Sequence, residues 1–413
     1  MLGGRGWGDI ACFCHLTDRQ GLTLGEKHQD LLPRRTRQRL EKGGRDFGKL
    51  DISGHPPRIV LFRHIAIFRY VDGMKTHDAL VIGAGQSGLA AAYAFSQQGI
   101  RPLVLDQAPT AGGSWSRYYQ SLSLFSPAGF SSLPGFPFPG DKQRYPGRDE
   151  VVSYLTEYAD SLDADFLWNQ QVTSLSRNEN SFEVITAAGQ THRAHRVVVA
   201  SGNFDSPHTP QIPGLPVFRG NALHSSEYLS PEPFAGQRLL VVGGGNSGVQ
   251  IAVELAATAR VSLVTRNPVR WQRQRMLGKD LHWWLAATGI DRLPWVPRSV
   301  PVVDSAGNRR RIADRHPEQR GMFHRVHPQG VDWGEGTVES VDALIFATGF
   351  RPNVQYLAQS GALDPAGMPL HAKGVSTTVP RLGFVGIEGQ RTFASATLRG
   401  VGRDARHVVN ALL

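Results

Sequence analysis

Two glycine-rich stretches have the spacing that lets a protein backbone hold a diphosphate. Both follow the pattern G-x-G-x-x-G, one in ALVIGAGQSG, residues 79–88, and the other in LLVVGGGNSG, residues 239–248. In such a loop the first glycine makes a tight turn, the second lets a diphosphate approach the backbone, and the third lets a helix pack closely on a strand. The amide groups at the start of that helix then face the phosphates. The two stretches therefore predict two dinucleotide sites.

The first loop predicts a dinucleotide whose ribose carries a free 2′-hydroxyl. Its glycines are Gly83, Gly85 and Gly88, with Ser87 beside the last of them. The following strand, PLVLD, ends at Asp106, which lies 18 residues after Gly88. A carboxylate at this position accepts a hydrogen bond from a ribose 2′-hydroxyl. Strand, loop, helix, strand and acid occur in the expected order, which is more specific than the glycines alone.

The second loop predicts a dinucleotide with a 2′-phosphate. Its second strand, VSLVTR, ends at Arg266, again 18 residues after the last glycine, so a cation stands where the first site has an acid. A 2′-phosphate would be repelled by a carboxylate but pairs with a guanidinium. The residues expected to contact this cofactor from the loop are Gly243, Gly245, Asn246, Ser247 and Gly248. The economical pair of ligands is FAD in the first site and NADPH in the second.

Strands and helices alternate around both loops, which predicts an α/β fold with two Rossmann-like three-layer domains. RVVVASGNF, residues 196–204, and DALIFATGFRPN, residues 342–353, each end a strand in a small-residue turn where the chain crosses between domains. Thr348 and Gly349 in the second turn are expected near a bound nucleotide. The FAD domain is thus expected to be split by the NADPH domain. The expected boundaries are 1–73 for an N-terminal extension, 74–205 and 336–413 for the two parts of the FAD domain, and 206–335 for the NADPH domain with its linker.

Composition narrows the remaining classes of protein. The chain has 413 residues, 40% of them apolar and 19% charged, as expected for a globular protein of several domains. Residues 1–73 show little periodicity, and we expect that they are an upstream extension rather than part of the fold. Two cysteines, Cys12 and Cys14, exclude a disulfide framework and favour a cytoplasmic protein. The net charge of +10 accompanies no nucleic-acid motif and suits anionic ligands.

A third stretch carries a resemblance to a known family. FRGNALHSSEY, residues 218–228, lies between the two loops and fits the pattern F-x-G-x-x-x-H-x-x-x-Y at every specified position. With GAGQSG, GGSW at 112–115, GGGNSG and ATGF, it resembles the flavin-containing monooxygenases, the class B flavoprotein monooxygenases. The resemblance covers about residues 76–413. It is greatest to a bacterial subgroup labelled with arsenic or heavy-metal resistance or ion transport, although no residue here shows arsenic chemistry.

The resemblance implies a reaction and roles for individual residues. NADPH reduces FAD, the reduced flavin reacts with O2 to a C4a-(hydro)peroxyflavin, and one oxygen atom passes to a small molecule. No metal is needed, and a homodimer without a membrane span or nucleic-acid partner is expected. His224 is expected to act in domain coupling or cofactor placement, and Ser225 and Tyr228 to reach the NADPH side; His224 and Tyr228 are the catalytic candidates. The second FAD contact would come from Gly113, Ser114 and Trp115.

Two alternatives remain open at this stage. The first is an NADPH-dependent flavin oxidoreductase that reduces a quinone or a metal without oxygenation; a disulfide reductase lacks the necessary cysteine pair, because Cys12 and Cys14 are wrongly spaced and precede the first loop. The second is a regulatory protein that senses NADPH. One departure from the family is also evident. Animal members often carry an Asn after the GGxW motif, where this chain has Phe125, Ser126 and Pro127.

Overall fold

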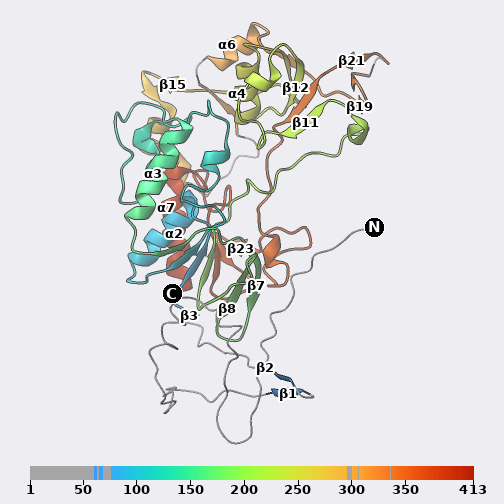
Figure 1. Ribbon diagram of the computed structural model, residues 1–413. Coiled ribbons are helices and arrows are strands. Elements are labelled where there is room, and N and C mark those ends of the chain that lie inside the picture. The colour runs from blue at the N-terminus through green and yellow to red at the C-terminus, as the bar shows by residue number, and fades with distance from the viewer. Residues whose placement is uncertain (1–59, 63–64, 68–75, 295–299, 306, 335) are drawn as a thin grey trace, which may run out of the picture. The chain divides into compact units, whose positions relative to one another are not determined.

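The computed structural model describes residues 60–62, 65–67, 76–294, 300–305, 307–334 and 336–413 (Figure 1). Contacts within the chain define two units, Met1–Gly73 and Met74–Leu413. In the first unit, β1 (Val60–Phe62) pairs antiparallel with β2 (Ile65–Ile67). The rest of the expected N-terminal extension, with Cys12 and Cys14, lies outside the described residues.

A seven-stranded sheet forms the centre of one half of the second unit. Its order is β23-β24-β25-β10-β4-β5-β6, and the strands from β25 to β6 are parallel. Strands such as LVI, LVL and VVV are buried on both faces, which is why they are short continuous apolar runs. The bounds are β4 (Leu80–Ile82), β5 (Leu103–Leu105), β6 (Asp165–Leu167), β10 (Val197–Val199), β23 (His371–Ala372), β24 (Val375–Ser376) and β25 (Leu382–Phe384).

Helices cover one face of this sheet and a smaller, mixed sheet covers the other (Figure 1). Val81 packs toward α2 (Gln86–Ser96), α3 (Arg148–Asp160) and α7 (Leu398–Leu412). Leu80 and Ile82 point the opposite way, as alternation along a strand requires, and pack against the second sheet. That sheet has the order β3 (Thr76–His77), β9 (Thr191–Ala194), β8 (Phe182–Thr186) and β7 (Val172–Arg177). The predicted three-layer arrangement is confirmed.

A second three-layer arrangement is built on a five-stranded parallel sheet. Its strands, in spatial order, are β11 (Asn221–His224), β22 (Ala343–Phe346), β12 (Arg238–Val242), β13 (Arg260–Val264) and β18 (Glu318–Arg320). One face packs on α4 (Asn246–Leu255) and α6 (Asn308–Ala313). The other packs on the antiparallel strands β19 (Arg325–His327), β20 (Gly330–Asp332) and β21 (Val338–Ser340). The predicted α/β class with two Rossmann-like domains is confirmed.

The expected domain boundary at residue 335 does not follow these sheets. A boundary there would put strand β22 in the second part of the FAD domain, but β22 lies between β11 and β12 in the five-stranded sheet. The chain returns to the seven-stranded sheet only after the A-T-G turn, where Pro207 forms a bridge with Phe350. The two crossings therefore run side by side. The local strand pattern of β22 is the same for either sheet, so the sequence alone could not assign it.

Two long segments outside the sheets approach the first glycine loop. One, residues 112–147, contains η2 (Gly113–Arg117) and η3 (Ala128–Phe130). The other leaves β13 and contains β14 (Trp271–Arg273), β15 (Arg275–Met276), β16 (Lys279–Asp280), α5 (Leu281–Thr288), η6 (Ile290–Arg292) and β17 (Val302–Asp304). Single turns of 3-10 helix complete the fold: η4 (Leu215–Val217), η5 (Glu232–Phe234) and η7 (Gln355–Leu357). Within the described residues, no helix has the length and apolar character needed to span a membrane.

Candidate active site

Two glycines of the first loop are required by packing. Gly83 has φ of 104°, and a Cβ there would lie 2.5 Å from the carbonyl oxygen of Ala200 in the neighbouring crossing. A Cβ on Gly88 would lie 1.7 Å from the carbonyl oxygen of Gly83. Any side chain at Gly88 would therefore push α2 away from β4. These contacts are the tight turn and the close helix–strand approach that the sequence pattern predicts.

The middle glycine faces open space instead. The nearest atom to a Cβ on Gly85 would be the Cα of Gly113, at 3.7 Å. Gly85 is the N-cap residue of α2 and offers no side chain to the first amide groups of the helix. A Cβ on Gly113, in turn, would lie only 2.9 Å from the Cα of Gly85. The two backbones thus form a narrow cradle of free N–H groups, which fits a diphosphate.

Asp106 lies at the end of β5, 7% exposed, and its carboxylate is held by the backbone around it. It accepts hydrogen bonds from the N–H groups of Ala84 and Ala108, the latter at 2.7 Å. Burial raises the pKa of Asp106, and these two hydrogen bonds act against that rise. The carboxylate therefore connects the glycine loop to the second strand and also lines the cavity described next.

A cavity of about 1910 Å³ begins at the first glycine loop. It extends along the 112–147 segment, reaches the start of α7, and meets Asn246 of the second loop. The predicted FAD residues that line it are Gly83, Gly85, Ser87, Asp106, Gly113, Ser114 and Trp115. Gly88 does not line it because it is buried between α2 and β4. The structure therefore places most of the residues predicted to bind FAD along one wall of the cavity.

The second glycine loop repeats the geometry of the first. Gly243 has φ of 134°, and a Cβ there would lie 2.2 Å from the carbonyl oxygen of Ala347; on Gly248 it would lie 2.1 Å from that of Gly243. Gly245, the N-cap residue of α4, has no described atom within 4 Å of its Cβ position. This open amide terminus also fits a diphosphate.

The two residues that follow Gly245, Asn246 and Ser247, contact different parts of the protein. The Asn246 side chain accepts a hydrogen bond from the N–H of Val303 at 3.2 Å and lines the cavity. Ser247 lies by the hydroxyl of Tyr119, which donates to Gln250. Tyr119 belongs to the 112–147 segment, so this contact connects the helix of the second loop to the wall of the first site.

Arg266 lies two residues beyond β13 and is exposed. Among the described residues it has no hydrogen-bond or ion-pair partner, and it does not line the cavity. The guanidinium is thus free to pair with a group outside the protein. This placement suits the predicted 2′-phosphate contact.

His224 is the last residue of β11, and its ring is hydrogen-bonded between the two segments that connect the domains. Its Nε2 donates to the carbonyl oxygen of Gly349 at 3.0 Å, and its Nδ1 accepts from the N–H of Ser226 at 3.1 Å. The ring also lies edge-on to Phe350, 4.8 Å between centroids. Burial lowers the pKa of His224, which favours the neutral ring. His224 does not line the cavity, so its contacts are those of a domain-coupling residue.

The other predicted site residues in the connecting segments are also hydrogen-bonded within the protein. The N–H of Ser225 donates to the carbonyl oxygen of Phe346 at 2.9 Å. The Thr348 hydroxyl donates to the carbonyl oxygen of His208. Gly349, with φ of 85°, accepts from both His224 and the N–H of His208. None of these residues lines the cavity.

Tyr228 does not occupy the position expected of a catalytic candidate. It is 0% exposed and packs near Tyr119 and Phe234 in the core of the five-stranded half. Its hydroxyl donates to Glu254 of α4 at 2.8 Å, and burial with this carboxylate raises the pKa of Tyr228. The spacing pattern locates Tyr228 correctly beside the second domain, but hydrophobic packing turns the ring into the core.

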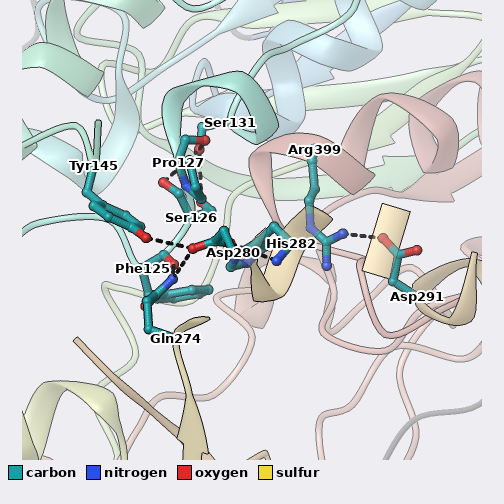
Figure 2. A network of polar contacts seen from close by, with 10 residues as sticks. All are labelled: Phe125, Ser126, Pro127, Ser131, Tyr145, Gln274, Asp280, His282, Asp291 and Arg399. Carbon is teal, nitrogen blue, oxygen red and sulfur yellow. Dashed lines mark hydrogen bonds and ion pairs between the residues drawn. The ribbon is translucent and has the colours of Figure 1, made fainter. Parts of the chain in front are cut away.

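Several cavity residues were not identified from the sequence. Gln86 accepts from Nε1 of Trp115 at 3.2 Å and donates to the carbonyl oxygen of Ala396, just before α7. Figure 2 shows a second group, in which Asp280 is surrounded by Tyr145, Gln274 and His282. His282 and Arg399 line the cavity. The pair Asp280-x-His282 was a usable signal, but no local pattern places residues 268–294 near the first loop.

The fold and the two loops define a flavoprotein with two dinucleotide-binding domains. Residues 80–386 match the family described as pyridine nucleotide-disulphide oxidoreductase. The chain belongs to this family and, within it, to the class B flavin monooxygenases. It is a flavin-dependent monooxygenase whose cofactors are FAD and NADPH. The resemblance seen in the sequence is therefore confirmed.

Three relatives support this assignment. The solved flavin-containing monooxygenase from Stenotrophomonas maltophilia is 33% identical, with a TM-score of 0.73 over 82% of this chain and 98% of that one. An uncharacterized CzcO-like oxidoreductase from Geobacillus kaustophilus is 32% identical over 81% of this chain and 98% of its own. The rice indole-3-pyruvate monooxygenase YUCCA1 is 30% identical over 80% of this chain and 90% of its own.

Proposed function

We propose that this enzyme uses NADPH and FAD to insert one oxygen atom from O2 into a small organic molecule. The observation that carries the proposal is the single cavity that begins at the open Gly85 cradle and reaches Asn246 beside the second open cradle. A dinucleotide held at the first loop would lie along this cavity, and one held at the second loop would meet it at Asn246. Bound FAD supplies the redox chemistry and the activation of O2.

The first site would hold FAD. The amides at Gly85 and the start of α2 bind the diphosphate, Asp106 accepts from the adenosine ribose, and Gly113, Ser114 and Trp115 form the facing wall. Gln86 positions Trp115 and the residues before α7 through its two hydrogen bonds. These residues belong to the domain that we assign to 74–205 and the chain after the A-T-G turn.

The second site would hold NADPH. The amides at Gly245 and the start of α4 bind its diphosphate, and Arg266 pairs with its 2′-phosphate. His224 acts as a positioning residue, because its two ring hydrogen bonds hold the crossings between domains in a single arrangement. The domain assigned to this site runs from 206 to the A-T-G turn, where β22 ends.

Exclusion of water is the remaining requirement, since an oxygenating flavin enzyme loses its oxidant as hydrogen peroxide when water enters. On one side of the cavity, residues 268–294 contact the 112–147 segment. Tyr145 donates to Asp280 at 2.6 Å, and Gln274 donates to the carbonyl oxygen of Phe125 at 3.1 Å. These hydrogen bonds join the two segments across the cavity wall.

Isotope labelling tests the proposal. The FAD-loaded enzyme is given NADPH and 18O2 with a panel of small thioethers, amines, ketones and aryl acids, and the products are analysed by mass spectrometry. We expect one 18O atom in the product of at least one compound, with one NADPH consumed per product. Quantitative hydrogen peroxide with every compound, and transfer of electrons to a quinone or metal instead, would establish the reductase alternative.

A further inference from the structure

One part of the cavity combines aromatic walls with polar groups that the cofactor sites do not use. Phe125 and Phe130, from the 112–147 segment, lie against the ring of His282 with centroid distances of 6.0 and 6.3 Å. All three rings line the cavity, as does Leu285 of α5. An apolar or aromatic molecule therefore has a surface on which to pack, with one imidazole at its edge.

Asp280 fixes the orientation of His282. The Nδ1 of His282 lies 2.8 Å from Oδ1 of Asp280, so this nitrogen donates to the carboxylate. The other carboxylate oxygen accepts from Tyr145 at 2.6 Å and from Gln274 at 2.5 Å (Figure 2). Burial acts to raise the pKa of Asp280, but the hydrogen bonds outweigh it and lower the pKa to about 2. Asp280 is thus a positioning residue with a permanent negative charge.

The second ring nitrogen of His282 is left for a ligand. The His282 side chain is only 4% exposed, and its Nε2 has no hydrogen-bond partner within the described part of the chain. A polar atom that faces a cavity and has no protein partner is free to bind water or a ligand. Because the ring lines the cavity, that ligand comes from the cavity.

Arg399 adds a second donor. It is the second residue of α7, its side chain is 12% exposed, and it lines the same cavity. Within the described residues, its hydrogen-bond partner is Asp291, reached through Nη1. Figure 2 shows Arg399 on the side of His282 that is away from Tyr145. The other N–H groups of the guanidinium are available to a ligand.

We propose that His282 and Arg399 bind the carboxylate of a small aryl acid whose ring packs against Phe125 and Phe130. The proposal rests on the function proposed above and names the class of substrate. A guanidinium fork and a protonated imidazole can each donate to one carboxylate oxygen.

Binding to the oxidised, FAD-loaded enzyme tests this directly. Benzoate, phenylacetate and 3-phenylpropanoate, each beside its neutral amide, are titrated by calorimetry without NADPH. We expect the best carboxylate to bind at least about tenfold more tightly than its amide. His282→Gln and Arg399→Gln should each weaken the carboxylate on the order of tenfold or more and leave the amide unchanged. Arg310→Gln, at an exposed site on α6, is the matched control.

Folding is controlled separately. Arg399→Gln leaves the buried Asp291 without a partner, so the double variant Arg399→Gln with Asp291→Asn removes both charges together. It should bind FAD like the parent and lack the preference for carboxylates. Equal affinities for all acids and their amides would overturn the proposal. So would unchanged carboxylate binding in His282→Gln, or a loss confined to NADP+ in Arg399→Gln. Since no turnover is measured, these outcomes are independent of the 18O experiment.

Discussion

The Nε2 atom of His224 lies 3.0 Å from the carbonyl oxygen of Gly349 and donates to it. This hydrogen bond joins the crossing that enters the five-stranded half to the crossing that leaves it. The backbone N–H of His224 is bound by the Glu227 carboxylate at 2.8 Å, so the residue is held from both sides. This geometry supports the proposed positioning role of His224, because both ring nitrogens are hydrogen-bonded within the segments that connect the domains.

Replacing His224 with Gln should lower the free energy of unfolding by about 1–2 kcal/mol, because two buried hydrogen bonds are lost or weakened. Urea unfolding at pH 7.5 measures the change. His195→Gln, at a site away from both crossings, should change it by less than about 0.5 kcal/mol. An unchanged stability in His224→Gln would contradict the coupling role.

The same residue predicts a dependence of stability on pH. Burial lowers the pKa of His224 below its ordinary value of 6.5, so the unfolded chain takes up the proton first as the pH falls. Stability is therefore fully present above pH 6.5 and decreases as the pH falls below it. Unfolding series between pH 8 and 5.5 should show a smaller decrease in His224→Gln than in the parent. Identical slopes would show that the histidine is not held neutral.

Arg266→Gln should separate the two nicotinamide cofactors. Because its guanidinium is exposed and has no described partner, the change should leave the melting temperature unaltered. The KM for NADPH should rise on the order of tenfold or more, while that for NADH should change less than about threefold. Steady-state kinetics with both cofactors measure this, with Arg310→Gln as control. Equal changes in KM for both cofactors would contradict the assignment of Arg266 to the 2′-phosphate.

Two alanine substitutions in the first loop should have different effects, one on folding and the other on FAD binding. Gly88→Ala places a Cβ 1.7 Å from the carbonyl oxygen of Gly83 and should prevent stable folding. Gly85→Ala meets nothing closer than 3.7 Å, so the apoprotein should fold while FAD binds more weakly, because the methyl group enters the cradle. Thermal unfolding of the apoprotein and FAD titration distinguish the two. Tight FAD binding by Gly85→Ala would exclude the diphosphate from this loop.

Tyr228→Phe should affect stability and leave the reaction alone. The half-buried Glu254 carboxylate loses its donor, so we expect a decrease of about 1–2 kcal/mol in the free energy of unfolding. The kcat should stay within about twofold of the parent, since the ring lies in the core and does not reach the cavity. A kcat reduced by tenfold at full folding would restore Tyr228 as a catalytic candidate.

The features that could be predicted from the sequence are those formed by residues that lie close together along the chain. The spacing of the loop glycines predicts a strand–loop–helix turn because Gly83 and Gly88 each meet a backbone atom within that unit or at the end of its adjacent strand. The strand β22 shows the limit of this reasoning. Its apolar run is compatible with either sheet, and only the pairing with β11 and β12 decides that it belongs to the second.

By itself, the sequence predicted two dinucleotide sites, the loops expected to hold their phosphates, and the loop expected to prefer a 2′-phosphate, because these expectations rest on short contiguous motifs. Only the tertiary structure decided that Tyr228 is a core residue and that Asp280, His282 and Arg399 meet the first site. Asp280 is 119 residues from Arg399 and 135 from Tyr145 along the chain. Such contacts depend on how two long segments pack across a cavity, and no local periodicity records that packing.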